Sequence, residues 1–234
     1  MHNWFVSIAS NRTLDFYILM AIAMLLTRIP VAGRYFRSLN TMVHEGGHAF
    51  MTLLLSGEVI AVNLFADTSG NTITKSKNRF FQLLIALAGY TSSALTGLLF
   101  IFLLSKGYHV HILFFLVSLA LLLLVLSIRN AYGLFWAGTF SLVNLLLIYF
   151  NDPTGIYLAA AFYTLIILTD AVWSSIILMV IAVKTPKKAG DAANLQKFTG
   201  IPAVIWTLFF VTFSILMAYY AFTRFFPPLH ELYR

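Results

Sequence analysis

Two histidines and a glutamate in the stretch NTMVHEGGHAF have the residue types and spacing of a metal-dependent hydrolytic site. His44 and His48 are four residues apart, so on a helix both side chains project from one face, about one turn apart. Two such imidazoles can hold a zinc ion, whose catalytic sites add a third protein ligand and keep one position open for water. Glu45 lies close to that open position and can act as a general base. We therefore expect His44 and His48 as metal ligands and Glu45 as the catalytic residue.

The elements that must position this motif belong to a membrane protein. Hydrophobic residues make up 60% of the 234 residues and charged residues only 10%, against about 25% charged residues in a soluble domain. Apolar runs at residues 112–128 and 157–183 approach or exceed the ~20 residues that cross a bilayer as a helix. The net charge of +7 comes from basic residues scattered beside apolar runs rather than along one stripe. This distribution predicts a lipid bilayer, and no nucleic acid, as the partner.

The predicted fold is an all-α polytopic membrane protein with about six to seven transmembrane helices in a single domain, residues 1–234. We see no repeat of fixed length and no symmetry between two halves, which favours one domain. The motif lies on a shorter helix, residues 36–56. The other predicted spans cover residues 15–32, 80–104, 110–128, 132–150, 155–183 and 203–226.

Residues 57–79 interrupt the apolar pattern and predict a short β-hairpin at the membrane edge, directly after the motif helix. The β-branched runs VIAV and TIT are separated by turn-forming residues, which is typical of a strand, a turn and a return strand. This segment is too polar to face lipid. Residues 184–202 are expected to form a long polar loop, in which Asp191 suits a helix N-cap and is assigned no chemistry.

The lysines and arginines predict the orientation of a multi-pass protein in the cell membrane. If every predicted helix crosses once, nine basic residues lie on one side and six on the other. The side with more basic residues is expected to be cytoplasmic, and it carries the N-terminus and the hairpin. The nine are Arg12, Lys75, Lys77, Arg79, Arg129, Lys184, Lys187, Lys188 and Lys197.

Asp170 is the residue that we select as the third metal ligand, with Asp152, Asp191 or another residue as the alternative if Asp170 does not bind the metal. The chain has no cysteine, which excludes thiolate ligands. Asp170 lies in the middle of a long apolar span, in LIILTDAVWSS, where coordination to a divalent cation would offset the desolvation of its carboxylate. Thr169, Ser174 and Ser175 could instead form hydrogen bonds to a neutral acid. With Asp170 and Glu45 as carboxylates, two neutral imidazoles and a doubly charged ion, the charges of the site sum to zero.

These residues and three further motifs resemble the intramembrane zinc metalloproteases of the site-2 protease family, most closely a compact bacterial branch without a PDZ domain. The motifs follow in the same order over about residues 40–206: NTMVHEGGHAF, a strand-like segment ending in SGNTIT, LAGYTSSALTG and GDAANLQKFTGIPAVIW. The resemblance implies a Zn²⁺ site formed by His44, His48 and an aspartate from a later helix, with Glu45 as the catalytic base.

The resemblance also implies that the strand-like segment takes up an extended substrate by β-augmentation. A transmembrane helix must be unwound before it is cut, and a free strand edge can pair with the exposed backbone. The family places its aspartate in an Asn-Pro-x-x-Asp-Gly-type sequence, from which LTDAVWSS departs. Asn144 is a candidate for the family's substrate-binding or oxyanion-stabilising asparagine, and a helix–helix hydrogen bond is the alternative.

The leading hypothesis is a zinc-dependent intramembrane endopeptidase that cuts in or next to a transmembrane segment of a membrane protein or peptide. One alternative is a metal-cation transporter that uses the same polar residues along a permeation path. Another is a non-proteolytic scaffold that binds a membrane helix, in which the motif residues only form hydrogen bonds to neighbouring helices or face water. Ionisable groups at membrane depth are costly and usually functional, which favours a metal site.

Overall fold

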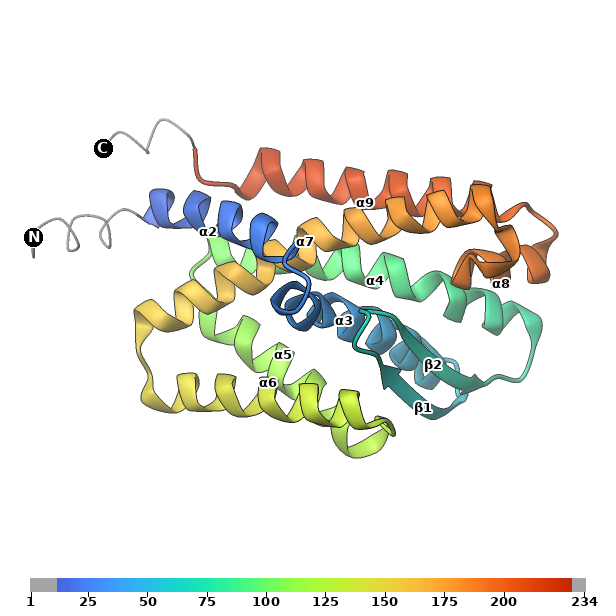
Figure 1. The fold of residues 1–234 in the computed structure, drawn as a ribbon, viewed down its shortest axis with the longest axis horizontal. Helices are drawn as coiled ribbons and strands as arrows, with labels where there is room; N and C mark the ends of the chain where they lie inside the picture. Colours follow the sequence, from blue (N-terminus) through green and yellow to red (C-terminus); the bar gives the residue numbers. More distant parts are fainter. Residues whose placement is uncertain (1–11, 229–234) are drawn as a thin grey trace, which may run out of the picture.

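The computed structural model describes residues 12–228, which form long helices along a common axis, a two-stranded hairpin and a short helix α8 at one end (Figure 1). The elements in chain order are α2 (Arg12–Leu26), α3 (Ala32–Leu54), β1 (Glu58–Leu64), β2 (Gly70–Lys75), α4 (Arg79–Ser105), α5 (His109–Leu126), α6 (Ala131–Phe150), α7 (Pro153–Lys184), the 3-10 turn η1 (Pro186–Lys188), α8 (Gly190–Thr199) and α9 (Ala203–Phe225).

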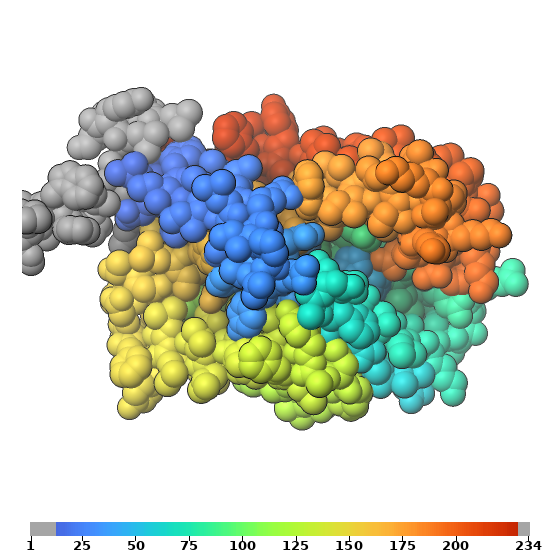
Figure 2. Space-filling view, viewed as in Figure 1, coloured from blue at the N-terminus to red at the C-terminus, as the bar shows by residue number. Residues whose placement is uncertain are grey.

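Five of these helices, α4, α5, α6, α7 and α9, are long and apolar enough to cross a membrane. The apolar stretch of α2, Thr13–Leu26, is shorter. The structure therefore confirms a helical multi-pass membrane protein with a hairpin after the motif helix. Figure 2 shows α2 and the start of α3 on one face of the molecule, between α7 and the α5–α6 pair.

Helix ends coincide with residues that satisfy free backbone groups. The Asp152 carboxylate accepts hydrogen bonds from the amides of Thr154 and Gly155 at the start of α7, and Pro153 occupies the first turn, where no amide donor is needed. The Asn78 side chain accepts a hydrogen bond from the amide of Phe81 and begins α4 in the same way.

The start of the motif helix α3 is anchored by a contact with α6. The Trp136 indole is fully buried and donates a hydrogen bond of 2.7 Å to the backbone oxygen of Tyr35. Trp136 also stacks on Phe140, with 5.1 Å between the ring centroids. These contacts anchor the first turn of α3, and the helix then runs beside α4 with its polar face toward the hairpin and α8.

The hairpin is an antiparallel pair in which Val62 faces Thr72, Asn63 faces Asn71 and Leu64 faces Gly70. The outer edge of β1 is covered by the α5–α6 connection. The Val62 amide donates to the backbone oxygen of Ser127 over 2.9 Å, and the Asn130 side chain bonds both the amide and the carbonyl of Leu64. Within residues 12–228, no comparable partner covers the outer edge of β2.

The predicted late loop contains a helix, α8, of which only an N-cap at Asp191 is predicted from the sequence. α8 begins at Gly190, so Asp191 is its second residue and not its N-cap. α8 has ten residues and is followed by Gly200, whose φ of 77° is the left-handed conformation that glycine adopts readily. A cluster of small and apolar side chains packs α8 against α4, α7 and α9. Its buried members are Ala86, Leu178, Ala182, Ala189, Ala192, Leu195, Ala203 and Phe210.

The hairpin and α8 lie at one end of the long axis, and the start of α2 and the end of α9 lie at the other (Figure 1). Five described helices are apolar enough to cross alone, against the six to seven predicted, because α2 is shorter and α3 carries a polar face. That the N-terminus and the hairpin lie on one side of the membrane stays a prediction. Residues 1–11 lie outside the described residues, and which end is cytoplasmic stays a prediction.

Replacing Asn130 by alanine should loosen the hairpin without unfolding the helices. The substitution removes two hydrogen bonds to Leu64, each of which contributes about 0.5–1.5 kcal/mol. We expect hydrogen exchange of the β1 amides to accelerate by about one order of magnitude, as measured by exchange mass spectrometry.

Asn63→Ala is the matched control for this experiment, because it removes an exposed side-chain hydrogen bond of 2.8 Å to Asn71 within the hairpin. Its exchange should stay close to that of the wild-type protein. Equal protection in Asn130→Ala and wild type would show that the connection does not hold β1.

Candidate metal centre

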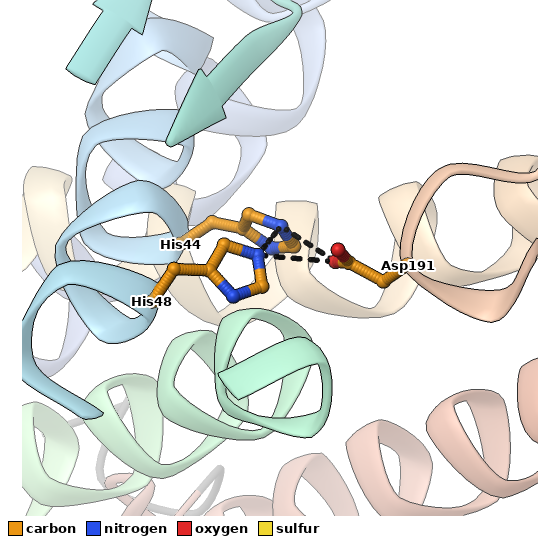
Figure 3. Close-up of side chains that lie close together, drawn as sticks. All are labelled: His44, His48 and Asp191. Carbon is orange, nitrogen blue, oxygen red and sulfur yellow. Dashed lines mark hydrogen bonds and ion pairs between the residues drawn. The ribbon is translucent and has the colours of Figure 1, made fainter. Parts of the chain in front are cut away.

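The two motif histidines of α3 meet an aspartate of α8 in a nearly equilateral triangle of donor atoms (Figure 3). His44 Nε2 lies 3.1 Å from His48 Nε2 and 3.1 Å from Asp191 Oδ2. His48 Nε2 lies 3.2 Å from the same Asp191 oxygen. α3 supplies two of the donors one helical turn apart, and α8 supplies the third from a position 143 residues later.

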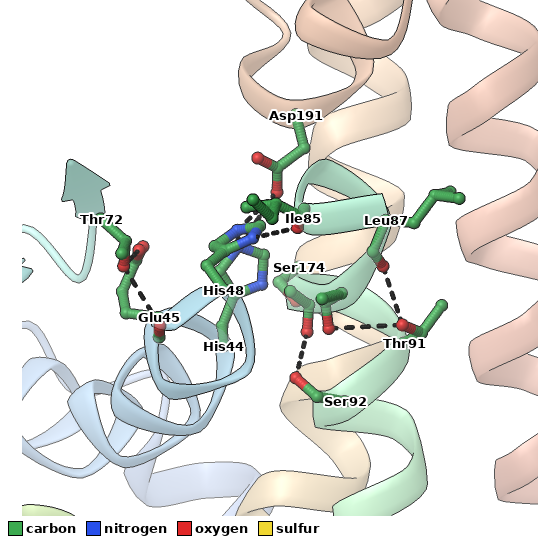
Figure 4. A network of polar contacts seen from close by, with 12 residues as sticks. His44, Glu45, His48, Thr72, Ile85, Leu87, Thr91, Ser92, Ser174 and Asp191 are labelled. Carbon is green, nitrogen blue, oxygen red and sulfur yellow. Dashed lines mark hydrogen bonds and ion pairs between the residues drawn. The ribbon is translucent and has the colours of Figure 1, made fainter. Parts of the chain in front are cut away.

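The ring of His48 is oriented by a backbone carbonyl of α4. His48 Nδ1 lies 2.6 Å from the backbone oxygen of Ile85 (Figure 4). A carbonyl oxygen only accepts hydrogen bonds, so Nδ1 of a neutral His48 carries the proton and Nε2 presents a lone pair to Asp191 and His44. Metal-bound histidines are commonly held by such an outer hydrogen bond.

His44 is held by an aromatic side chain of α4. The Tyr90 ring lies edge to face against the His44 ring, with centroids 4.6 Å apart. Tyr90 in turn stacks on Phe210 of α9 at 4.8 Å. The two histidine rings are thus supported from α4 by different means, one by a carbonyl oxygen and the other by an aromatic ring.

Gly89 leaves the space in front of the histidine nitrogens open. A Cβ atom built on Gly89 would lie 2.5 Å from both His44 Nε2 and His48 Nε2. No side chain fits there, whereas a small ion bonded to these nitrogens needs that kind of space. The residue of α4 that faces the donor triangle is therefore a glycine, which leaves room for an ion.

The triangle fits the geometry that zinc requires. Zinc bonds of ~2.0–2.2 Å at tetrahedral angles place neighbouring ligand atoms roughly 3.4 Å apart, close to the 3.1–3.2 Å separations found here. Two imidazole nitrogens and one carboxylate oxygen also form a typical ligand set of catalytic zinc, which keeps its fourth position open. His44, His48 and Asp191 could therefore hold a zinc ion.

Asp191 carries a negative charge in this arrangement. Burial alone raises the pKa of its carboxyl group. The positive charge of His48 and His44 in their protonated forms, together with their hydrogen bonds, outweighs burial and holds the pKa well below its usual range. Asp191 is the second residue of α8, outside the membrane-crossing helices. An ionised carboxylate is the form that binds a metal.

Glu45 lies beside the triangle and is held by the hairpin. Its side chain is buried, and Oε2 accepts a hydrogen bond of 2.7 Å from the Thr72 hydroxyl of β2 (Figure 4). A Cβ atom on Gly70 would lie 2.6 Å from Glu45 Oε1, so β2 approaches this carboxylate closely. The strand thus positions the predicted catalytic residue.

A cavity of about 580 Å³ opens over these groups. α3 contributes His44, Glu45 and His48 to its lining, and β2 and α8 form further walls with Thr72 and Asp191. The cavity therefore brings the donor triangle, the carboxylate of Glu45 and the outer edge of β2 to one space that a peptide could enter.

Asp170, predicted as the third ligand, lies elsewhere in the same cavity. Its Oδ1 accepts a hydrogen bond of 2.8 Å from Arg37 Nε, and its Oδ2 lies 3.3 Å from Asn40 Nδ2. Asp170 is thus paired with Arg37 of α3. The structure brings Asp191, and not Asp170, to His44 and His48, and the identity of the third ligand stays a prediction.

Asn144, the predicted asparagine of the substrate site, is buried within α6. Its Nδ2 donates to the backbone oxygen of Phe140 over 2.8 Å. Asn144 does not line the cavity over the metal centre, whereas Asn40 of α3 and Asn194 of α8 do. The structure therefore does not bring Asn144 to the donor triangle.

The sequence contained a signal for Asp191 that spacing alone did not reveal. Asp191 stands in GDAANL, one of the motifs that carry the family resemblance, whereas LTDAVWSS around Asp170 departs from the family's pattern. The polar composition of α8 predicts an exposed loop, so Asp191 was not chosen as a ligand. Tyr90, which follows Gly89 in LAGYTSS, lies within an apolar span, and nothing in that span indicates that its side chain contacts His44.

Asp191→Asn should lose zinc, and Asp170→Asn should keep it. The first substitution removes an ionised ligand, so zinc affinity should fall by more than the roughly 10–100-fold cost of losing an outer hydrogen-bond partner. The second weakens the contact with Arg37 and should lower the free energy of unfolding by about 1–3 kcal/mol. Metal analysis and thermal unfolding of the purified proteins measure both effects. Loss of zinc from Asp170→Asn alone would restore Asp170 as the ligand.

Gly89→Ala should exclude the metal without disrupting the fold. The added methyl group would lie 2.5 Å from both histidine nitrogens and compete with any ion bound to them. We expect the zinc content to fall below about a tenth of the wild-type value, with little change in helical content by circular dichroism. Gly138→Ala on α6 is the control, since its Cβ would contact nothing within 4 Å. Full zinc occupancy in Gly89→Ala would refute the proposed place of the ion.

Comparison with known proteins agrees with the geometry of this centre. The family described as Peptidase M50B-like matches residues 17–221, a range that contains His44, Glu45, His48 and Asp191. Comparisons with curated proteins and with solved structures found no match. The match covers most of the chain, and its description names a peptidase. The chain therefore belongs to the Peptidase M50B-like family, the site-2 protease family that its motifs resemble.

Proposed function

We propose that this protein is a zinc-dependent intramembrane endopeptidase that hydrolyses peptide bonds in or next to a transmembrane segment of a membrane protein. The observation that carries this proposal is the convergence of His44, His48 and Asp191 within 3.2 Å of one another, with Glu45 in the same cavity. Family membership supports a peptidase. The five apolar helices support a substrate that lies in the bilayer.

A zinc ion held by the three ligands would supply Lewis-acid chemistry at the scissile carbonyl. Glu45 would take a proton from the attacking water and deliver it to the nitrogen of the departing amine. The Thr72 hydroxyl donates a hydrogen bond to Glu45 Oε2 and so limits the rotation of the carboxylate. Oε1 accepts no hydrogen bond from another described residue and is the oxygen available for this proton.

The β2 edge can bind a peptide in extended form. Val62 and Leu64 direct their backbone groups away from β2, toward Ser127 and Asn130. Their partners Thr72 and Gly70 therefore occupy non-hydrogen-bonded positions of the pair, and the backbone groups of these two residues point away from β1. A substrate strand could pair with them.

This edge lies next to the proposed catalytic groups. Thr72 contributes its hydroxyl to Glu45 while its backbone amide and carbonyl remain available for an added strand. A peptide paired with β2 would thus run past Glu45 and the zinc ligands. An unwound membrane helix needs such backbone partners, because lipid offers none.

We place the hairpin end of the molecule in the cytoplasm. The hairpin, the start of α4 and the connection from α7 to α9 carry seven basic residues at this end, and the positive-inside rule favours the cytoplasm for it. They are Lys75, Lys77, Arg79, Lys184, Lys187, Lys188 and Lys197. Cleavage would then release a fragment on that side.

Glu45→Gln should keep its zinc and lose proteolysis. Glutamine has the shape of glutamate and can still bond Thr72, but it cannot accept the proton. We expect cleavage of a membrane-protein substrate in proteoliposomes to slow by about 10²–10⁴-fold, with zinc content equal to that of the wild type. A gel-based cleavage assay and metal analysis on the same samples measure both.

Glu58→Gln is the matched control, because Glu58 is an exposed acid at the start of β1. It should leave cleavage unchanged. Unchanged cleavage in Glu45→Gln would rule out the proposed mechanism. Zinc-dependent cation flux into the same liposomes, without any cleavage by the wild type, would instead favour the transporter.

A further inference from the structure

A second cavity, of about 330 Å³, lies between α2, α7 and α9, apart from the donor triangle. We call it the α2–α7–α9 cavity. Its wall is largely apolar, with Met24, Leu168, Val172, Trp173, Ala218 and Phe226. Its polar lining consists of Thr27, Arg28, Arg37, Thr169 and Asp170. Two guanidinium groups beside an apolar wall, one from the α2–α3 connection and one from α3, need an explanation that the proposed peptidase mechanism does not supply.

Arg28 is held in place without using its hydrogen-bond donors. The guanidinium carbon lies 4.0 Å from the centroid of the Trp173 ring, so Arg28 rests against the indole. Among the described residues, none accepts a hydrogen bond from the Arg28 side chain and none forms an ion pair with it. Its planar set of N–H groups is therefore available to a ligand.

Arg37 is oriented by Asp170 but keeps donors free. Only Nε of Arg37 bonds to Asp170, at 2.8 Å. Within residues 12–228, no acceptor is found for its two terminal amino groups. The second oxygen of Asp170 accepts a hydrogen bond of 3.3 Å from Asn40 Nδ2. Both oxygens of this α7 carboxylate therefore have partners on α3, and the carboxylate fixes the orientation of Arg37.

The charges of the cavity sum to +1, from two arginines and one aspartate. The hydroxyls of Thr27 and Thr169 donate hydrogen bonds to the backbone oxygens of Met24 and Leu165 and add no charge. A ligand with one negative charge and several acceptor oxygens would balance this sum. A phosphodiester has both properties, and guanidinium groups bind phosphate with paired hydrogen bonds.

We propose that the α2–α7–α9 cavity binds the headgroup phosphate of an anionic phospholipid. Arg28 and Arg37 contact the phosphate, and an acyl chain lies along the apolar wall. The exposed apolar side chains of α2 around the cavity, including Met24 and Leu25, are surfaces that lipid covers. Basic groups between membrane helices are a recognised means of binding lipid headgroups.

This site is adjacent to the metal centre but independent of it. Arg37 and Asp170 line both cavities, and Arg37 precedes His44 by two helical turns on α3. Neither arginine is a zinc ligand, so lipid binding should be separable from zinc binding and from cleavage.

Native mass spectrometry of the full-length protein, released from vesicles containing equal amounts of phosphatidylglycerol and phosphatidylcholine, tests the proposal. The wild type should retain phosphatidylglycerol preferentially. Arg28→Gln should reduce this preference by about fivefold, the effect of roughly one basic residue at an anionic membrane surface. Trp173→Leu should reduce the preference as well, because Arg28 loses the aromatic ring against which its guanidinium packs. Trp173→Phe keeps an aromatic ring and should retain more of the preference.

Arg34→Gln is the matched control, since Arg34 is an exposed arginine of α3 that lines neither cavity. It should retain the wild-type preference. Equal retention of both lipids by the wild type, or an equal loss in Arg34→Gln and Arg28→Gln, would overturn the proposal. Inorganic phosphate that raises the melting temperature of the lipid-free protein through Arg28 would assign the site to free phosphate and overturn the lipid. Zinc content measured in each sample separates these outcomes from a failure of the metal centre.

Discussion

The structure depends on the convergence of three donor atoms from two helices that are distant in sequence. His44 and His48 come from α3, and Asp191 comes from α8 near the other end of the chain. Lone pairs and a carboxylate at 3.1–3.2 Å repel one another unless protons or a cation lie among them. The helices must therefore be held by other contacts. The apolar side chains that pack α8 against α4, α7 and α9 provide such contacts, as does the hydrogen bond from the buried Trp136 of α6 to the first turn of α3.

α4 is the support against which this convergence occurs. The carbonyl of Ile85 contacts His48, and the ring of Tyr90 packs against His44. Gly89 has no side chain and so leaves space in front of the histidine nitrogens. Each of the three contributions comes from one stretch of a single membrane-crossing helix. A rigid apolar helix can thus shape a polar centre through its backbone and through small residues, without placing a charge in the membrane.

The polar interior is divided into pairs that compensate one another. Asp170 is paired with Arg37 and Asn40, and Asp191 is paired with the two histidines. Both aspartates reach the same cavity, so burial of a carboxylate does not by itself distinguish the aspartate that meets the histidines from the one that meets Arg37. The distinction lies in the neighbours. A guanidinium satisfies one aspartate, and two imidazole nitrogens face the other.

The sequence by itself determined the class of protein, the placement of two histidines and a glutamate on one helix, and the strands. Apolar runs longer than about 18 residues and a four-residue histidine spacing depend only on local periodicity. The tertiary structure alone decided which aspartate joins the histidines. That outcome depends on the packing of α8, which carries Asp191, and on the ion pair between Arg37 and Asp170. The tertiary structure also decided that α2 and α3 together lead the chain across the molecule once, and that the face of β2 with Gly70 and Thr72 lies against Glu45. Contacts between residues more than 100 positions apart have no local pattern, so they appear only when the helices are packed.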